Sequence, residues 1–195
     1  MNRENPDPRP DIEQAWRLVN EALASQPLPP LEAWLAHWLM AFLYQWRDND
    51  FSRSVVEARK AVDLAPYDSY CRNDLSWVLA NAGYSDEGIT WARSALNHDP
   101  NGPSRYSANL AWAYYVAGRA HEAVDALREW SAEFPVLYAA LLVRLGQVEK
   151  AKAVIADYLK SGGGDTVERE DIFPLAEPTG TEYLDVLRKS GLPEK

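Results

Sequence analysis

The sequence predicts an all-α protein built from consecutive helix-turn-helix repeats, because one pattern recurs at a fixed spacing. Three segments of 18 residues end in proline, and their starts at positions 49, 83 and 118 lie 34 and 35 residues apart. A second apolar segment of helical length precedes each of them. The three segments are NDFSRSVVEARKAVDLAP (49–66), GYSDEGITWARSALNHDP (83–100) and GRAHEAVDALREWSAEFP (118–135).

Each of these segments is expected to form one helix that packs closely on the helix before it. Small residues seven positions apart share a helix face: Ser54, Gly88 and Ala123 in the sixth column, Ala61 and Ala95 in the thirteenth. Trp130 stands in the thirteenth column of the third segment, so its packing should differ. Proline is expected to end each helix. Glycine in mid-helix costs about 1 kcal/mol against alanine, so Gly88 predicts an unusually close helix contact.

Two weaker copies of the pattern extend the array on both sides. They are PDIEQAWRLVNEALASQP (10–27) and GQVEKAKAVIADYLKSGG (146–163). The apolar partner helices are expected at residues 31–47, 69–82, 104–117 and 136–145.

This pattern resembles the tetratricopeptide repeat (TPR), a 34-residue helix-turn-helix unit. The residues that carry the resemblance are Leu110, Tyr114, Gly118, Ala123 and Pro135 in one copy and Leu75, Gly83, Ala95 and Pro100 in the copy before it. The resemblance covers about residues 11–161 and implies a right-handed α-solenoid. A narrower likeness, carried mostly by LRKSGLPE (187–194), is to the TPR module found C-terminal to some bacterial nucleotide cyclases and winged-helix regulators.

The expected organisation is one solenoid with an additional segment at each end. Residues 1–10 are predicted to be a disordered arm and residues 165–195 a helical cap for the exposed last repeat. The alternative for the last helix is that it folds back into the groove of the stack. The solenoid itself spans 11–164, with a half-repeat at 11–27, repeats at 31–66, 69–100 and 104–135, and a short repeat at 136–163.

Composition narrows the classes of partner and compartment. The net charge of −9 disfavours nucleic acid, because an acidic chain repels phosphate backbones. The longest apolar run, residues 31–46, is too short and too polar to span a bilayer, and the N-terminus has no apolar core of a signal peptide. The single cysteine, Cys71, is typical of a reducing compartment. We therefore predict a soluble, cytoplasmic protein.

The residue pattern contains no constellation typical of an enzyme. His37, His98 and His121 do not lie at metal-ligand spacing, and Cys71 has no candidate base near it in sequence. The glycine-rich SGGGD (161–165) lacks the lysine of a phosphate-binding loop. No catalytic activity, cofactor or metal is predicted.

The TPR resemblance implies that the first helix of each repeat lines a concave groove. Aromatic residues are frequent hot spots of binding, so we expect a scaffold or adaptor that binds a peptide or helix of a protein partner there. The alternative for these aromatics is packing between repeats. Two other functions stay open: self-association as a homo-oligomer and binding of a small ligand in a Trp-lined pocket. The predicted groove residues are Leu39, Leu43, Trp46, Tyr70, Asn73, Trp77, Arg105, Asn109, Trp112 and Tyr115.

Overall fold

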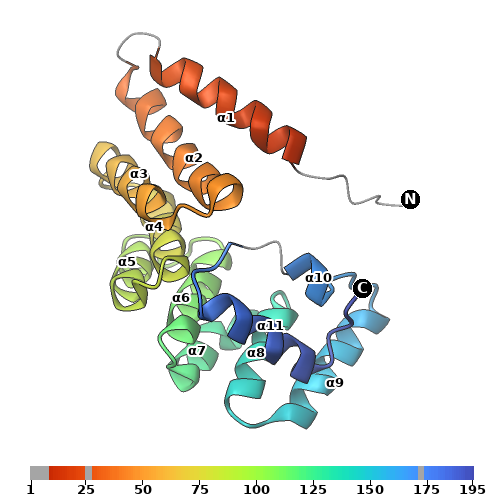
Figure 1. The fold of residues 1–195 in the computed structure, drawn as a ribbon. Coiled ribbons are helices and arrows are strands. Elements are labelled where there is room, and N and C mark those ends of the chain that lie inside the picture. The colour runs from red at the N-terminus through yellow and green to blue at the C-terminus, as the bar shows by residue number, and fades with distance from the viewer. Residues whose placement is uncertain (1–8, 25–27, 171–173) are drawn as a thin grey trace.

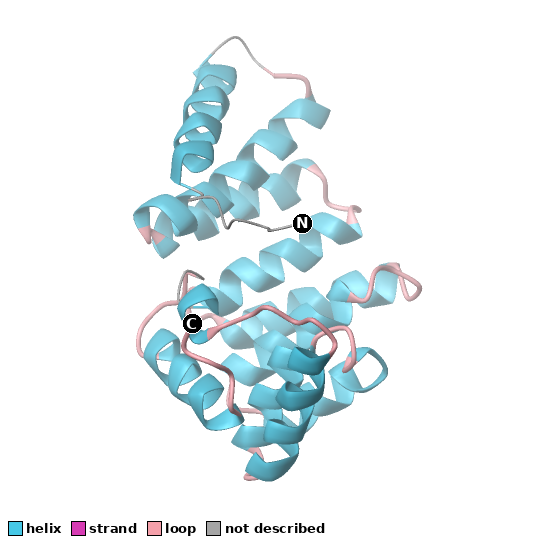
Figure 2. Cartoon of the chain, turned by 90° about the vertical axis from the view of Figure 1, so that its right-hand side faces the viewer, coloured by secondary structure: helices cyan, strands magenta, loops and turns pink. Residues whose placement is uncertain are grey.

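The computed structural model describes residues 9–24, 28–170 and 174–195, and the regular structure in these ranges is helical throughout (Figure 2). The first helices are α1 (Arg9–Ala24), α2 (Pro30–Asp48), α3 (Phe51–Leu64), α4 (Ser69–Asn81) and α5 (Ser85–His98). They are followed by α6 (Arg105–Val116), α7 (Ala120–Leu127), the short 3-10 helix η1 (Arg128–Trp130), α8 (Pro135–Arg144) and α9 (Val148–Lys160). The C-terminal segment contains α10 (Val167–Glu170) and α11 (Thr179–Ser190).

The prediction of an all-α chain is confirmed. The apolar helices expected at 31–47, 69–82, 104–117 and 136–145 are α2, α4, α6 and α8, each within one residue at both ends. Residues 1–8 of the predicted N-terminal arm lie outside the described residues, whereas residues 9 and 10 begin α1. Within the described ranges, no helix combines the length and the apolar character that crossing a bilayer requires.

Helices that are neighbours in the chain are also neighbours in space. Each helix from α1 to α9 packs on the next one, and α4 also contacts both α2 and α6 (Figure 1). The helices α2, α4 and α6 therefore form a row. We call the side of this row that carries Trp38, Phe42, Tyr70, Trp77, Asn109 and Trp112 the inner face.

The turns between paired helices depend on a left-handed residue. Gly83, Gly118 and Gly146 follow α4, α6 and α8 with φ of 86°, 73° and 74°, a region that glycine enters without steric cost. Asn49 holds the equivalent place after α2 with φ of 51°. Asparagine tolerates this conformation better than most residues, which explains why it can replace glycine in the first copy.

Proline limits the second helix in two of the three copies. α3 ends at Leu64 and α5 at His98, each two residues before Pro66 or Pro100, because the residue before proline is disfavoured in the helical region. The third copy differs from the expectation that its helix continues to Pro135. There α7 ends at Leu127, and η1 turns Trp130 outward to 38% exposure, since an indole does not fit a column of buried small residues.

The largest hydrophobic cluster joins α6, α8 and α9 to the C-terminal segment. Tyr183, Val186, Leu187 and Leu192 are part of it, and α11 packs on both α8 and α9 (Figure 1). Between α10 and α11, the backbone N–H of Ala176 donates to the carbonyl of Asn81 at 2.9 Å. The tail therefore packs on α8 and α9 and also reaches α4.

Candidate functional site

The inner face carries a hollow of about 370 Å³ between α2, α4 and α6, which we call the aromatic hollow. Phe42 stacks on Trp77 with ring centroids 5.4 Å apart, and Trp38 meets Phe42 edge-on at 5.1 Å. Tyr70 remains 38% exposed at its rim. The hollow is lined by Trp38, Phe42, Tyr70, Asp74, Trp77, Arg105 and Asn109.

One charged pair fixes a wall of this hollow. Arg105 forms an ion pair with buried Asp74, and Trp38 Nε1 donates to the other carboxylate oxygen at 2.7 Å. The guanidinium also lies 3.8 Å from the centroid of the Tyr70 ring and donates to its hydroxyl at 3.0 Å. Burial raises the pKa of Asp74, although Arg105 and Trp38 both oppose the rise. The charge of Asp74 is thus compensated within the protein.

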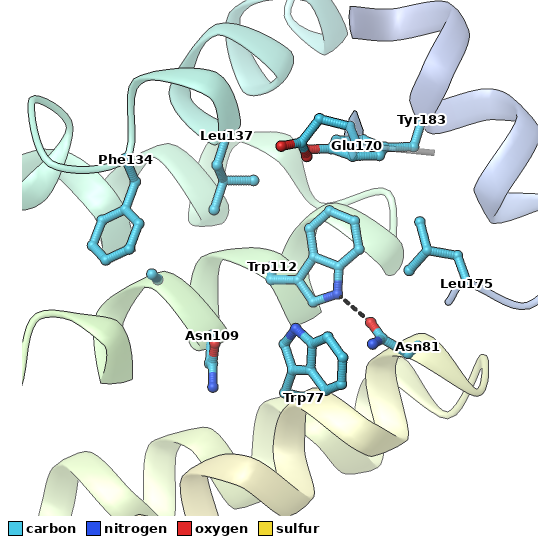
Figure 3. Close-up of a pocket in the computed structure, with 10 residues that line it drawn as sticks. Trp77, Asn81, Asn109, Trp112, Phe134, Leu137, Glu170, Leu175 and Tyr183 are labelled. Carbon is cyan, nitrogen blue, oxygen red and sulfur yellow. Dashed lines mark hydrogen bonds between the residues drawn. The ribbon is translucent and has the colours of Figure 1, made fainter. Parts of the chain in front are cut away.

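A second cavity, of about 310 Å³, lies where the tail approaches α4, α6 and α8, and we call it the tail-covered cavity (Figure 3). Trp77 and Asn109 line both spaces, so the cavity continues from the aromatic hollow. It is lined by Trp77, Asn81, Ala108, Asn109, Trp112, Phe134, Leu137, Glu170, Leu175 and Tyr183.

Buried hydrogen bonds hold the floor of the tail-covered cavity. Trp112 Nε1 donates to Asn81 Oδ1 at 2.7 Å, the bond drawn in Figure 3. Asn81 Nδ2 in turn donates to Gln45 Oε1 at 3.4 Å, and Gln45 Nε2 donates to the carbonyl of Val78 at 3.2 Å. Because these groups are buried, breaking one bond leaves a polar atom without a partner.

Glu170 is the carboxylate of the tail-covered cavity. Figure 3 shows it beside Tyr183, above Trp112. The Tyr183 hydroxyl donates to Glu170 Oε2 at 3.3 Å. Burial raises the pKa of Glu170 to about 7, the carboxylate of Asp165 adds to the rise, and the hydrogen bond from Tyr183 opposes it.

The structure brings five of the ten predicted groove residues together on the inner face. Tyr70, Trp77, Arg105 and Asn109 line the aromatic hollow, and Trp77, Asn109 and Trp112 line the tail-covered cavity. Trp112 is itself largely buried.

The other five predicted residues lie elsewhere. Leu39 and Leu43 pack in a separate cluster with α1, because α1 covers the side of α2 that carries them. Asn73 and Tyr115 are buried at 0% and 2% exposure and offer a partner almost no surface. Trp46 lines a more polar hollow against Pro174 and Leu175 of the tail.

Sequence reasoning missed several residues that line the two spaces. Trp38 and Phe42 lie four positions apart in the apolar run, and this spacing, which places them on one helix face, could have indicated them from the sequence. Asn81 ends α4 and Glu170 belongs to the tail, and neither position is marked by the repeat pattern.

The described residues contain no group of three or more His, Cys, Asp or Glu side chains arranged to hold a metal ion. Burial raises the pKa of the Cys71 thiol to about 12, which keeps it protonated at neutral pH. His37 is half-buried and its ring Nδ1 meets the Glu57 carboxylate. No known family model matches the chain, and no curated protein matches it.

Proposed function

We propose that this chain is a right-handed TPR-type α-solenoid that acts as a non-catalytic scaffold or adaptor, binding a peptide or helix of a protein partner. The repeated contacts of small residues support the architecture. Ser54, Gly88, Ala123 and Ala151 occupy the same column of successive copies, and all are buried where paired helices meet. A left-handed turn residue stands five positions before each of these small residues.

The aromatic hollow is the observation that supports binding. It joins aromatic rings from α2 and α4 to an arginine from α6, so several repeats contribute to one surface. Tyrosine, tryptophan and arginine are the residues most enriched in binding hot spots. The ion pair and ring contact of Arg105 hold this wall in place before a partner arrives, which lowers the entropy lost on binding.

The tail limits where a peptide can lie. Leu175 and Tyr183 cover the inner face at α6 and α8, whereas none of the described tail residues lines the aromatic hollow between α2, α4 and α6. A partner segment is therefore expected to cross the aromatic hollow, with one or two side chains inserted between Tyr70 and Trp77.

The experiment begins with capture of a partner from native lysate on the immobilised chain, followed by its identification by mass spectrometry. Affinity for the purified partner is then measured for Tyr70→Ala and for the control Tyr84→Ala. Tyr84 is 54% exposed at the turn before α5 and does not line the hollow. We expect Tyr70→Ala to weaken binding about thirtyfold, as a hot-spot residue does, and Tyr84→Ala to leave it unchanged. Equal affinity of both variants and the unmodified chain would refute the proposal.

A further inference from the structure

The tail-covered cavity has the composition of a site for a small molecule. Its volume of about 310 Å³ lies at the lower end of the range of ligand sites, about 300–1,000 Å³. Four aromatic side chains from four different segments of the chain line it: Trp77, Trp112, Phe134 and Tyr183. Trp77 stacks on Phe42 and Trp112 stacks on Tyr115, so contacts outside the cavity hold both indoles in position.

Among the described residues, the negative charge of this cavity has no positive counterpart. Glu170 is the only carboxylate among the described residues that line it, and no described side chain forms an ion pair with it. Asp74, the other buried carboxylate of the inner face, pairs with Arg105. A carboxylate enclosed by apolar surface is costly when it is ionised and unpaired, and a cation from outside would remove that cost.

The aromatic walls of the cavity favour a quaternary ammonium group over other cations. Aromatic rings attract cations through their negative faces, and a quaternary ammonium group needs no hydrogen-bond acceptors. Both carbonyl oxygens of Asn81 are already engaged, the side-chain oxygen by Trp112 and the backbone oxygen by Ala176. An ammonium ion rich in N–H groups would have to find acceptors among Glu170, Asn109 and Tyr183, whereas a quaternary ammonium ion needs none.

We propose that the tail-covered cavity binds a small quaternary ammonium ion, with Glu170 as its counter-ion and Trp77, Trp112 and Tyr183 as its aromatic walls. The proposal does not rest on peptide binding in the aromatic hollow, since the counter-ion Glu170 belongs to the tail, although Trp77 lines both spaces. It also explains why the tail carries a carboxylate into an aromatic cavity.

The titratable groups around the site set its expected pH dependence. Within the described part of the chain, those that act on Glu170 are Tyr183 of α11 and Asp165 before α10, while the lining residues from α4, α6 and α8 contain none. Glu170 adds to the attraction of the aromatic walls only when it is ionised. With its pKa at about 7, the ionised fraction falls about thirtyfold between pH 8 and pH 5.5, and the affinity should fall with it.

The experiment compares choline with its neutral isostere 3,3-dimethylbutan-1-ol by isothermal titration calorimetry at about pH 8. We expect choline to bind about tenfold more tightly or better, and to lose affinity about tenfold or more at about pH 5.5. Choline is the probe for free ammonium ions, and a peptide containing trimethyllysine tests the same group on a side chain. Tighter binding of the peptide than of choline would assign the site to a modified partner, still as an ammonium site.

Two variants connect the result to Glu170. Glu170→Gln keeps the shape of the side chain and should reduce the preference for choline over the isostere to what the aromatic walls alone supply. Glu168→Gln is the matched control, because Glu168 lies exposed on the same short helix and does not line the cavity. Circular dichroism checks that both variants are folded. Equal binding of choline and isostere, absence of binding, or unchanged choline affinity in Glu170→Gln would overturn the proposal.

Discussion

Gly88 lies in the middle of α5, buried against α4, and its replacement by alanine sets two effects of opposite sign against each other. A Cβ at this position would lie 2.9 Å from the carbonyl oxygen of Ser76 and 3.4 Å from the backbone nitrogen of Ala80. Both atoms belong to the backbone of α4, so no side-chain rotation relieves the contact. The two helices must move apart by several tenths of an ångström.

The free-energy change follows from the difference between these effects. Alanine is the better helix former by about 1 kcal/mol. Overpacking of a close interface costs about 1–3 kcal/mol, and here the shift also loosens the neighbouring contacts of Ala92 and Ala95, which are fully buried. We expect Gly88→Ala to lower the free energy of unfolding by about 1 kcal/mol. That change corresponds to a decrease in Tm of about 2–4 °C for a chain of this size.

Urea unfolding followed by circular dichroism measures this change. Thr90→Ala on the same helix is the control, because Thr90 is exposed and its hydroxyl only donates to the carbonyl of Asp86. The control should change stability by less than about 0.5 kcal/mol. If Gly88→Ala were as stable as the unmodified chain or more stable, the close contact would not be the reason for glycine at this position.

Three further predictions concern Glu170, Cys71 and Trp112. The pKa of Glu170 is raised from 4.5 to about 7 by folding, so its ionisation opposes folding and the penalty accumulates as pH rises through this interval. Urea titrations should therefore show that Glu170→Gln gains stability relative to the unmodified chain as the pH rises. The difference in unfolding free energy should grow by about 2 kcal/mol between pH 5 and pH 8, after a discount for partial exposure. A difference that stays constant with pH would contradict this. Cys71, with a pKa of about 12, should react with a maleimide on the order of a hundredfold more slowly in the native than in the unfolded chain at pH 8, and similar rates would be inconsistent with its burial. Trp112→Phe removes the donor to Asn81 and should destabilise by about 1–3 kcal/mol in urea, while a loss below about 0.5 kcal/mol would show that water replaces the indole.

The positions of the helices could be predicted because each turn and each close helix contact of the repeat requires a particular residue type. Glycine or asparagine is needed where a residue enters the left-handed region, as at Gly83 and Asn49. Small residues are needed where helix axes approach each other. In the sixth column, Gly88 lies against the backbone of Ser76, and Ser54 is close enough to the preceding helix for its hydroxyl to donate to the carbonyl of Ala41 at 2.7 Å. These requirements act over a few residues, so a single sequence displays them.

The groove face of the first copy could not be assigned in the same way. Carrying the columns of the repeat onto α2 selects Leu39 and Leu43, but α1 covers that side of the helix. The inner face receives Trp38 and Phe42 instead. All four residues are apolar in one continuous run, so periodicity alone does not show which side of α2 another helix will occupy.

The site depends even more on a contact that no local pattern encodes. Tyr183 lies against Trp112 with ring centroids 5.1 Å apart, a contact across 71 positions of sequence (183 minus 112). This contact places Glu170 in an aromatic cavity beside a hollow whose own carboxylate, Asp74, is already paired. The two parts of the inner face therefore differ in charge although they share Trp77 and Asn109. It follows that their ligands should be separable: a change at Tyr70 should affect a peptide partner, and a change at Glu170 should affect a cation.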